Sequence, residues 1–289
     1  MLKLGTDPAG TGLPPGGDGR MWLDDDFREQ LQHADLAAFE RVMASVRGRC
    51  LRVLADRENW YFSAQVTHGS GMYLKKHHVR ARFEWLWERL GLACGENPGR
   101  SEARHAAALS ALGVNVMRVV AYGERRRADG LAQSFLLTEE LKDFVELGTF
   151  VRERFSPRRP GRRTAADREL ERLVCQVAAM ARRFHAAGYN HRDFYCCHFL
   201  VREENGDFQV RLIDLQRVQR RRWLRWRWIV KDLAQLAWSA PGDRLGCRHK
   251  ILFLRHYLGV EKLRRGDRRL LRAILRRCRN LQRRLGNGS

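Results

Sequence analysis

Two carboxylates, one in a loop and one at the end of a short apolar strand, are the residues of this chain best suited to chemistry. Asp193 follows His191 and Arg192, directly after a long helical pattern, and Asp214 lies in the short apolar run Val210–Leu215. A carboxylate in a loop can accept a proton from a hydroxyl, and one at a strand end can bind a divalent cation. We interpret Asn190–Val201 as a catalytic loop, although a buried His-Arg-Asp can also form a structural ion pair.

The order of these acids is typical of protein kinases. In those enzymes the Asp of His-Arg-Asp accepts the hydroxyl proton, an Asn five residues later binds metal, and a later Asp is the main magnesium ligand. Here His198 occupies the fifth position. We expect it to be a second metal ligand or a phosphate contact. Because imidazole is a poorer magnesium ligand than oxygen, His198 can instead hydrogen-bond Asp193 or be structural.

The amino-terminal half has the pattern of a small β-sheet. Strands are expected near residues 50–54 and 60–66, and a glycine turn at residues 68–71 leads to a strand that carries Lys75. Gly69 and Gly71 could cover nucleotide phosphates, or they could merely join two strands. Glu102, in the first turn of a helix, could hold Lys75 against those phosphates, or it could only complement the helix dipole.

Further elements position these residues. Residues 24–44 have the spacing of one helix, and strands are expected at residues 114–122 and 134–138. Glu140 and Leu141 follow the last strand as a hinge whose backbone would meet an adenine ring. Thr164 and Asp167 form a capping box at the start of a long helix that delivers the catalytic loop. A buried carboxylate needs donors, so Asp232, in an apolar helix, is expected to anchor that loop from beneath.

An arginine-rich and tryptophan-rich segment follows Asp214. Its arginines are candidate ligands for an anionic acceptor, and its indoles suit a membrane interface. The alternative is that the tryptophans belong to the core and the arginines to a solvated face. The arginines concerned are Arg217, Arg220, Arg221, Arg222 and Arg225.

Composition limits the possible partners. The chain has 289 residues and a formal net charge of +22, and only seven of its 55 basic residues are lysine. This charge favours polyanionic partners such as nucleic acid, anionic lipid or phosphorylated sugar, unless it reflects only base composition and a solvated surface. Seven cysteines without zinc-site spacing indicate a reducing compartment. No apolar run approaches the roughly 20 residues of a spanning helix, so any membrane contact is expected to be peripheral.

The predicted organisation has four parts. Residues 1–20, rich in Gly and Pro, are expected to be a disordered leader without signal-peptide character. Residues 21–141 would form an N-lobe with a preceding helix, and residues 142–285 a helical C-lobe that contains the catalytic loop. Residues 286–289 would be a polar tail.

With these residues in place, the chain resembles the lipopolysaccharide core heptose kinase family, the Kdo/WaaP group, from about Leu51 to Tyr257. Histidine at the position of His198 looks normal for this family. The residues that carry the resemblance are Tyr73–Lys75, Val119–Glu124, Ser134–Leu141, Asn190–Asp193 with Cys197–Leu200, Ile213–Leu215 with Arg217, and Lys231–Ala234.

The resemblance implies an α+β, two-lobed protein-kinase-like fold, with a small antiparallel sheet in the N-lobe and a mostly helical C-lobe. It implies ATP and Mg²⁺ as cofactors and a heptose of the lipopolysaccharide inner core as acceptor. The expected place is the cytoplasmic face of the bacterial inner membrane, as a peripheral protein. Asp193 would be catalytic and Asp214 would bind magnesium, while His191, Arg192 and Asp232 would support the loop.

Two alternatives stay open at this point. One is a kinase that acts on protein or on another sugar or lipid. The other is an inactive basic protein on a kinase fold that binds nucleic acid or serves as a scaffold, since arginine and tryptophan can stack on single-stranded bases. The presence of Lys75, Glu102, Asp193 and Asp214 argues against an inactive protein and makes a nucleic-acid partner unlikely. The oligomeric state does not follow from the sequence.

Overall fold

The computed structural model describes residues 20–80, 97–126, 131–157, 163–221, 223 and 225–286. The predicted leader, except Arg20, and most of the tail lie outside these residues, as does Arg222. The chain divides into two compact units. Unit 1 contains the described residues up to Ala111 and Met117–Lys142, and unit 2 contains Leu112–Val116 and the residues from Asp143 onwards.

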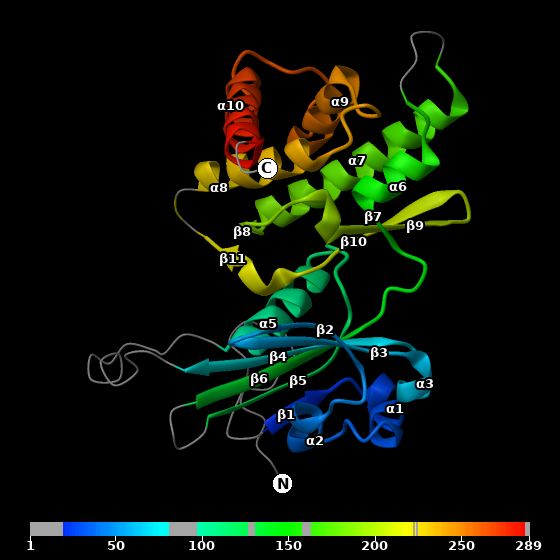
Figure 1. Ribbon diagram of the computed structural model, residues 1–289. Helices are drawn as coiled ribbons and strands as arrows, with labels where there is room; N and C mark the ends of the chain where they lie inside the picture. The colour runs from blue at the N-terminus through cyan, green and yellow to red at the C-terminus, as the bar shows by residue number, and fades with distance from the viewer. Residues whose placement is uncertain are drawn as a thin grey trace. The chain divides into compact units, whose positions relative to one another are not determined.

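Unit 1 is built on one antiparallel sheet of six strands, in the order β1-β5-β6-β4-β3-β2. In Figure 1, the helices α1 and α2 cover one face of this sheet and α5 lies on the other. The strands are β1 (Arg20–Leu23), β2 (Arg49–Leu54), β3 (Arg57–Phe62), β4 (Met72–Arg80), β5 (Val119–Arg126) and β6 (Leu131–Glu139). The helices are η1 (Asp25–Phe27), α1 (Arg28–His33), α2 (Phe39–Ala44), α3 (Ala64–Thr67) and α5 (Pro98–Ala111).

Side chains along β4 alternate between the two faces of the sheet. Leu74 is fully buried in the cluster that Leu31 and Phe39 form with the sheet. The next residue, Lys75, therefore points to the opposite face, where α5 carries Glu102. The side chain of Lys75 therefore lies on the face of the sheet that α5 covers.

The prediction of one helix over residues 24–44 was wrong. Asp35 has a φ of 59°, a left-handed conformation that ends α1 and separates it from α2. Aspartate tolerates this conformation better than most residues, because its short polar side chain can bond locally. The predicted direct glycine turn between two strands also differs, because α3 lies between β3 and β4.

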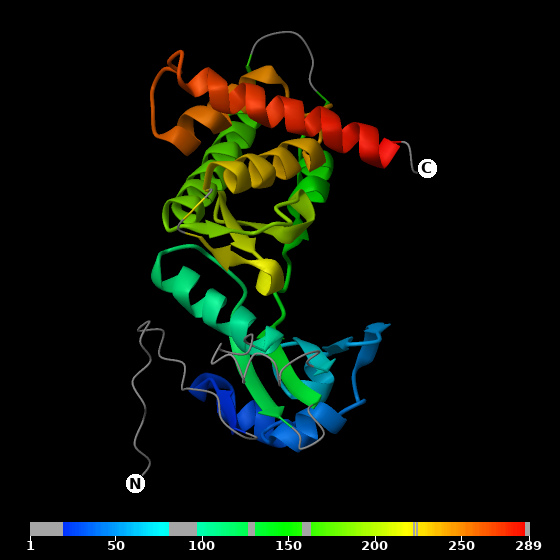
Figure 2. The same cartoon turned by 90° about the vertical axis from the view of Figure 1, so that its left-hand side faces the viewer.

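Unit 2 is mainly helical, as Figure 2 shows for the segments from α6 to α10. Its helices are α6 (Leu147–Arg154), α7 (Ala165–Ala186), η2 (Cys196–His198), η3 (Leu215–Arg217), α8 (Arg225–Ser239), α9 (Cys247–Leu258) and α10 (Asp267–Gly286). Its strands are β7 (Val145–Glu146), β8 (Tyr189–Asn190), β9 (Phe199–Glu204), β10 (Asp207–Leu212) and β11 (Gln219–Arg220). The α+β composition predicted from the sequence is confirmed.

The long helix α7 begins and ends as its sequence predicts. Thr164 and Asp167 form the expected capping box, and Gly188 turns the chain with a φ of 88°. Because α9 packs along α7 and α10 along α8, these four helices support one another. The loop that follows Asn190 thus begins from a rigid support.

Candidate active site

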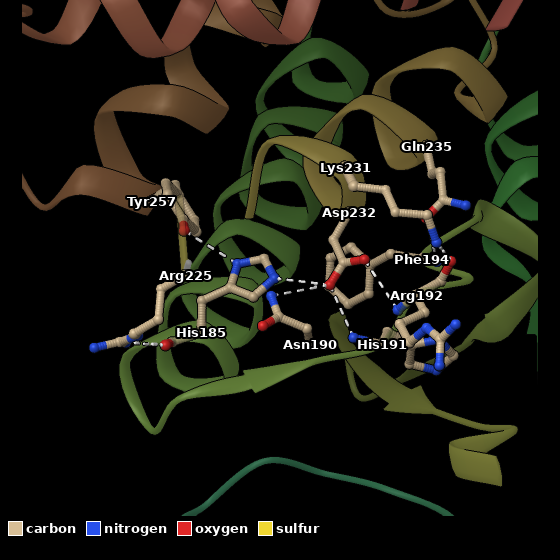
Figure 3. Close-up of polar contacts among 10 residues, drawn as sticks. All are labelled: His185, Asn190, His191, Arg192, Phe194, Arg225, Lys231, Asp232, Gln235 and Tyr257. Atoms are coloured by element: carbon tan, nitrogen blue, oxygen red, sulfur yellow. Dashed lines mark hydrogen bonds and ion pairs between the residues drawn. The ribbon is translucent and has the colours of Figure 1, made fainter. Parts of the chain in front are cut away.

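Asp232 on α8 is the predicted anchor of the loop. It is fully buried, and its carboxylate accepts hydrogen bonds from the backbone N–H groups of His191 at 2.8 Å and Arg192 at 3.0 Å. Figure 3 shows Asp232 at the centre of this network. Arg192 has a φ of 72°, a conformation that is costly for a residue with a side chain. The two hydrogen bonds that Asp232 accepts therefore stabilise a strained backbone directly before Asp193.

Two more residues on the same helix extend this anchor. Gln235 accepts a hydrogen bond from the N–H of Phe194 at 3.2 Å, and Ser239 accepts one from the N–H of Cys196 at 2.9 Å. Positions 232, 235 and 239 lie on one face of a helix. Gln235 and Ser239 were not predicted from the sequence. Their signal is polar residues at helical spacing on a face that is otherwise apolar.

A third layer lies behind Asp232. His185 Nε2 is 3.4 Å from its carboxylate, and the Tyr257 hydroxyl is 3.1 Å from His185 Nδ1. Lys231 donates a hydrogen bond to the carbonyl of Arg192 on the other side (Figure 3). The anchor thus connects α7, α8 and α9 through buried polar groups, which rigidify a core when they are fully bonded.

The side chain of Asp193 meets a guanidinium group. Arg217 Nη1 lies 3.0 Å from one carboxylate oxygen of Asp193 and 2.8 Å from the other. The Asp193 side chain is 24% exposed and that of Arg217 is 54% exposed. The candidate base is thus accessible and held in one orientation.

Asp214 is tied to the same loop through its neighbour Ile213. Buried His191 donates from Nε2 to the Ile213 carbonyl at 3.1 Å, and the Ile213 N–H donates to the His198 carbonyl at 2.9 Å. Burial, the first cause, and the nearby His198 lower the pKa of His191 to about 4, so it is neutral. His191 therefore connects the segment that carries Asp193 with the segment that carries Asp214.

His198 is bonded to the loop through one of its ring nitrogens. Its Nδ1 donates to the Asp193 carbonyl at 2.5 Å, and its Nε2 lies 3.7 Å from an Asp214 carboxylate oxygen. Burial alone would lower its pKa, but bonds to Cys197 and the Asp193 carbonyl, with the Asp214 carboxylate nearby, raise the pKa to about 9. The geometry thus favours the hydrogen-bonding alternative for His198.

The predicted ion pair of unit 1 is present. Lys75 Nζ on β4 lies 2.8 Å from Glu102 Oε1 on α5, with the Lys75 side chain 22% exposed and that of Glu102 fully buried. Gly99, one turn earlier on α5, lets the helix approach β6, because a Cβ atom there would be 2.8 Å from the Phe135 carbonyl. The close approach of helix and sheet places the carboxylate against the ammonium.

The glycine turn has a structural role within unit 1. A Cβ atom on Gly71 would collide with Glu140 Oε2, and one on Gly69 would lie 2.7 Å from the Gln30 side chain. Glu140 also donates its N–H to the Gly71 carbonyl at 2.8 Å. Side chains of unit 1 therefore fill the space beside both glycines. This geometry gives no support to the expected phosphate contact of Gly69 and Gly71.

The predicted hinge residues lie directly after β6. Besides its bond to Gly71, Glu140 accepts a hydrogen bond from the Tyr61 hydroxyl at 3.0 Å. Leu141 follows it and is half-buried. The side chain of Glu140 thus holds the segment against β3 and leaves the backbone of Leu141 as the candidate adenine contact.

The arginines after Asp214 have separate partners. Arg220 donates to the Ala187 carbonyl at 3.3 Å and Arg225 to the His185 carbonyl at 2.6 Å, where they stabilise the carboxyl end of α7. The guanidinium of Arg221 stacks 4.2 Å from the centroid of the Trp228 ring. Trp223 is 83% exposed, so the interpretation of all these tryptophans as core residues was wrong.

The carboxylate of Asp214 fits a magnesium ion that takes most of its ligands from a nucleotide and water. Within the described residues, no group of three His, Cys, Asp or Glu side chains could hold a metal by itself. Mg²⁺ usually takes only one or two carboxylates from a protein and obtains its other ligands from phosphates and water. Asp214, whose side chain is 41% exposed, can supply such a carboxylate.

The fold and these residues define a phosphotransferase of the protein-kinase-like class. Unit 1 carries a lysine–glutamate pair, and unit 2 carries one acid on the braced loop and a second acid shortly after β10. The sequence model of the Lipopolysaccharide kinase (Kdo/WaaP) family matches residues 41–257. This chain belongs to that family. The predicted fold and the predicted kinase class are thereby confirmed.

Several characterised proteins are similar over most of their length. The lipopolysaccharide core heptose(I) kinase WaaP of Pseudomonas aeruginosa is 35% identical over 262 residues, which cover 89% of this chain and 90% of that protein. The protein of the same name from Escherichia coli K12 is 30% identical over 229 residues, which cover 77% of this chain and 82% of that protein. A solved structure of WaaP in complex with acyl carrier protein is 34% identical, with a TM-score of 0.65, and covers 91% of this chain and 99% of that one.

Proposed function

We propose that this protein transfers the γ-phosphoryl group of ATP to a heptose hydroxyl of the lipopolysaccharide inner core. One observation carries the proposal: Asp193 and Asp214 lie on two segments that Asp232 and His191 brace, in a chain 35% identical to a heptose(I) kinase. Phosphoryl transfer requires mainly positioning and charge neutralisation. The braced loop supplies the first, and Lys75 supplies part of the second.

Each residue receives one role in this proposal. Asp193 orients the acceptor hydroxyl and takes its proton, and Asp214 holds Mg²⁺. Lys75, oriented by Glu102, neutralises phosphate charge. The bound Mg²⁺ supplies further neutralisation of the phosphates.

Five other predicted residues support these four. His191, Arg192 and His198 fix the backbone on both sides of Asp193. Glu140 and Leu141 present the backbone that meets adenine.

The test is phosphate transfer from labelled ATP, with magnesium, to a purified heptose-Kdo-lipid acceptor. Asp193→Asn should lower transfer by at least about 1,000-fold, while Asp25→Asn, which removes an exposed carboxylate, should leave it unchanged. Equal transfer by the Asp193 variant would contradict the catalytic assignment. Label on proteins but not on the glycolipid would favour another acceptor, and no ATP turnover with salt-sensitive nucleic-acid binding would favour the scaffold alternative.

The exposed tryptophans support a peripheral membrane position, which we propose to be the cytoplasmic face of the inner membrane. Trp223 and Trp226 are 83% and 47% exposed beside the arginines of this segment, a combination suited to an anionic lipid surface. No described helix has the length and apolarity needed to cross a membrane. Replacing both tryptophans with serine should weaken binding to anionic vesicles about tenfold or more.

The solved structure of the relative WaaP contains acyl carrier protein as its partner. We propose that this chain also binds acyl carrier protein, because α10 presents a continuous stripe of exposed basic residues that suits an acidic protein. Reversing two of these charges, with Arg272→Glu and Arg276→Glu, should abolish co-elution with acyl carrier protein and leave phosphotransfer unchanged. The stripe consists of Arg268, Arg272, Arg276, Arg279 and Arg283.

A further inference from the structure

The contact between Arg217 and Asp193 joins residues 24 positions apart. Both oxygens of the Asp193 carboxylate lie within 3.0 Å of a single guanidinium nitrogen, Nη1. A guanidinium has five N–H donors in a rigid plane. The Arg217 side chain, 54% exposed, therefore reaches Asp193 with one nitrogen and presents its other edge toward the surface.

The backbone fixes Arg217 in this position. Leu215 and Val218, on either side of it, are 0% and 2% exposed. Immediately afterwards β11 pairs with β8, with Gln219 opposite Asn190. Because Asn190 precedes Asp193 by three residues and Arg217 precedes Gln219 by two, this short ladder sets the two side chains next to each other.

The neighbouring cations have other partners. Lys231 donates to the Arg192 carbonyl, and Arg225 donates to the end of α7. Arg221 stacks on Trp228. Within the described part of the chain, Arg217 is the cation in hydrogen-bond contact with the carboxylate of the candidate base.

We propose that Arg217 is a catalytic residue that bridges Asp193 and the phosphoryl group during transfer. This inference rests on the proposed phosphotransfer and assigns Arg217 to the reacting phosphoryl group, whereas the sequence suggested a ligand of the acceptor. Its free edge matches two oxygens of a phosphoryl group, a geometry that arginine recognises with two hydrogen bonds.

The reaction step explains why one arginine serves both groups. A bond forms between the acceptor oxygen and the γ-phosphorus, and the bond from that phosphorus to the β,γ-bridging oxygen of ATP breaks, with the electron pair leaving on ADP. The hydroxyl proton passes to Asp193. As Asp193 loses its negative charge, its attraction for Arg217 weakens, and the guanidinium stabilises the charge of the transferred phosphoryl group.

The experiment compares Arg217→Gln and Arg217→Lys with Arg154→Gln. Arg154 is a matched control, because it contacts the Glu203 carboxylate with two nitrogens elsewhere in unit 2. Arg217→Gln should lower kcat for phosphotransfer about 100- to 1,000-fold with less than about a threefold change in the acceptor KM. Arg217→Lys should recover only part of the rate, because an ammonium cannot bridge two groups in a plane. Arg154→Gln should have the wild-type kcat.

A second measurement does not depend on the acceptor. ADP with magnesium and aluminium fluoride mimics the transferred phosphoryl group and should bind the wild type at least about tenfold more tightly than ADP alone. Arg217→Gln should lose this increase and bind ADP normally. If the wild type does not phosphorylate the glycolipid but shows this loss in the variant, the acceptor is wrong and the role of Arg217 stands.

Three results would overturn the inference. The first is a raised acceptor KM with unchanged kcat in Arg217→Gln, which would make Arg217 an acceptor ligand. The second is a lower melting temperature with an unchanged response to aluminium fluoride, which would make it structural. The third is a wild type that binds ADP equally well with and without aluminium fluoride.

Discussion

The side-chain carbonyl of Gln235 accepts a hydrogen bond from the backbone N–H of Phe194 at 3.2 Å. Phe194 is fully buried and stacks on Phe184 with ring centroids 5.7 Å apart. The residue after Asp193 is therefore held by α8 through its backbone and by α7 through its ring. The backbone on both sides of Asp193 is therefore attached to α8, at Arg192 through Asp232 and at Phe194 through Gln235.

Replacing Gln235 with leucine tests the attachment. The N–H of Phe194 would be left buried without a partner, so we expect a loss of about 1–3 kcal/mol of stability. We also expect kcat to fall about tenfold, because Asp193 would be positioned less well. Urea unfolding and steady-state kinetics measure the two effects. Ser239→Ala, which affects the more distant Cys196 N–H, should lower stability similarly and kcat less; equal kcat losses would contradict a local effect.

Replacing Glu102 with glutamine removes a charge from the Lys75 pair and keeps its shape. We expect kcat/KM for ATP to fall about tenfold or more, because the ammonium loses its orientation toward phosphate. Lys75→Met should lower it further. In the double variant the loss should not exceed that of Lys75→Met alone, since the two residues act as a unit. Additive losses would show that the two side chains act independently.

Adding one methyl group to Gly99 should disturb the same pair. The new Cβ atom of Gly99→Ala would lie 2.8 Å from the Phe135 carbonyl, a backbone atom that cannot turn aside. We expect a loss of about 1–3 kcal/mol and a higher KM for ATP, because α5 moves away from the sheet with Glu102. Gly242→Ala is the control, since no atom lies within 4 Å of its Cβ position. Equal stability of the two variants would contradict the close packing of α5.

Three buried histidines predict sensitivity to acid. Burial is the main cause that lowers the pKa values of His77, His105 and His191 from 6.5 to about 4. Between pH 6.5 and 4 the unfolded chain therefore binds more protons than the folded one, and stability decreases as the pH falls through this window. The expected loss at pH 5 is on the order of 1–2 kcal/mol for each histidine.

Urea unfolding between pH 5 and 8 measures this loss. His77→Gln should make the dependence on pH shallower, and the same change at exposed His256 should not; identical slopes would contradict the assignment. His198 acts in the opposite direction. Its pKa is raised to about 9. The protonated side chain therefore contributes stability that is complete below pH 6.5 and is lost as the pH rises toward 9.

Much of the framework followed from local patterns in the sequence. The capping box at Thr164 needs only residues three positions apart, and the apolar setting of Asp232 marks it as a buried acid that needs donors. The Lys75–Glu102 contact was expected from the order of a strand and a helix, and it is present at 2.8 Å. Each of these depends on spacing within one or two elements.

The features that the sequence did not predict depend on distant contacts or on single backbone angles. The left-handed φ of Asp35 splits an otherwise continuous helical pattern, and no periodicity reveals it. The contact of Arg217 with Asp193 arises from the ladder between β8 and β11, two strands of two residues each. Gln235 stands out in the sequence only as a polar residue on an apolar helix face, and its bond to Phe194 depends on the loop that this face contacts.

The hairpin between the two acids has an evolutionary consequence. β9 and β10 pair without interruption from Phe199 opposite Leu212 to Glu204 opposite Asp207, and Asn205 and Gly206 turn the chain with φ values of 53° and 75°. The positions of Asp193 and Asp214 are fixed at the base of this hairpin, where the His191 side chain and the His198 carbonyl bond to Ile213. The tip of the hairpin can therefore lengthen or shorten in descendants of this sequence. The number of residues between Asp193 and Asp214 would then change, while their relative positions in space are inherited unchanged.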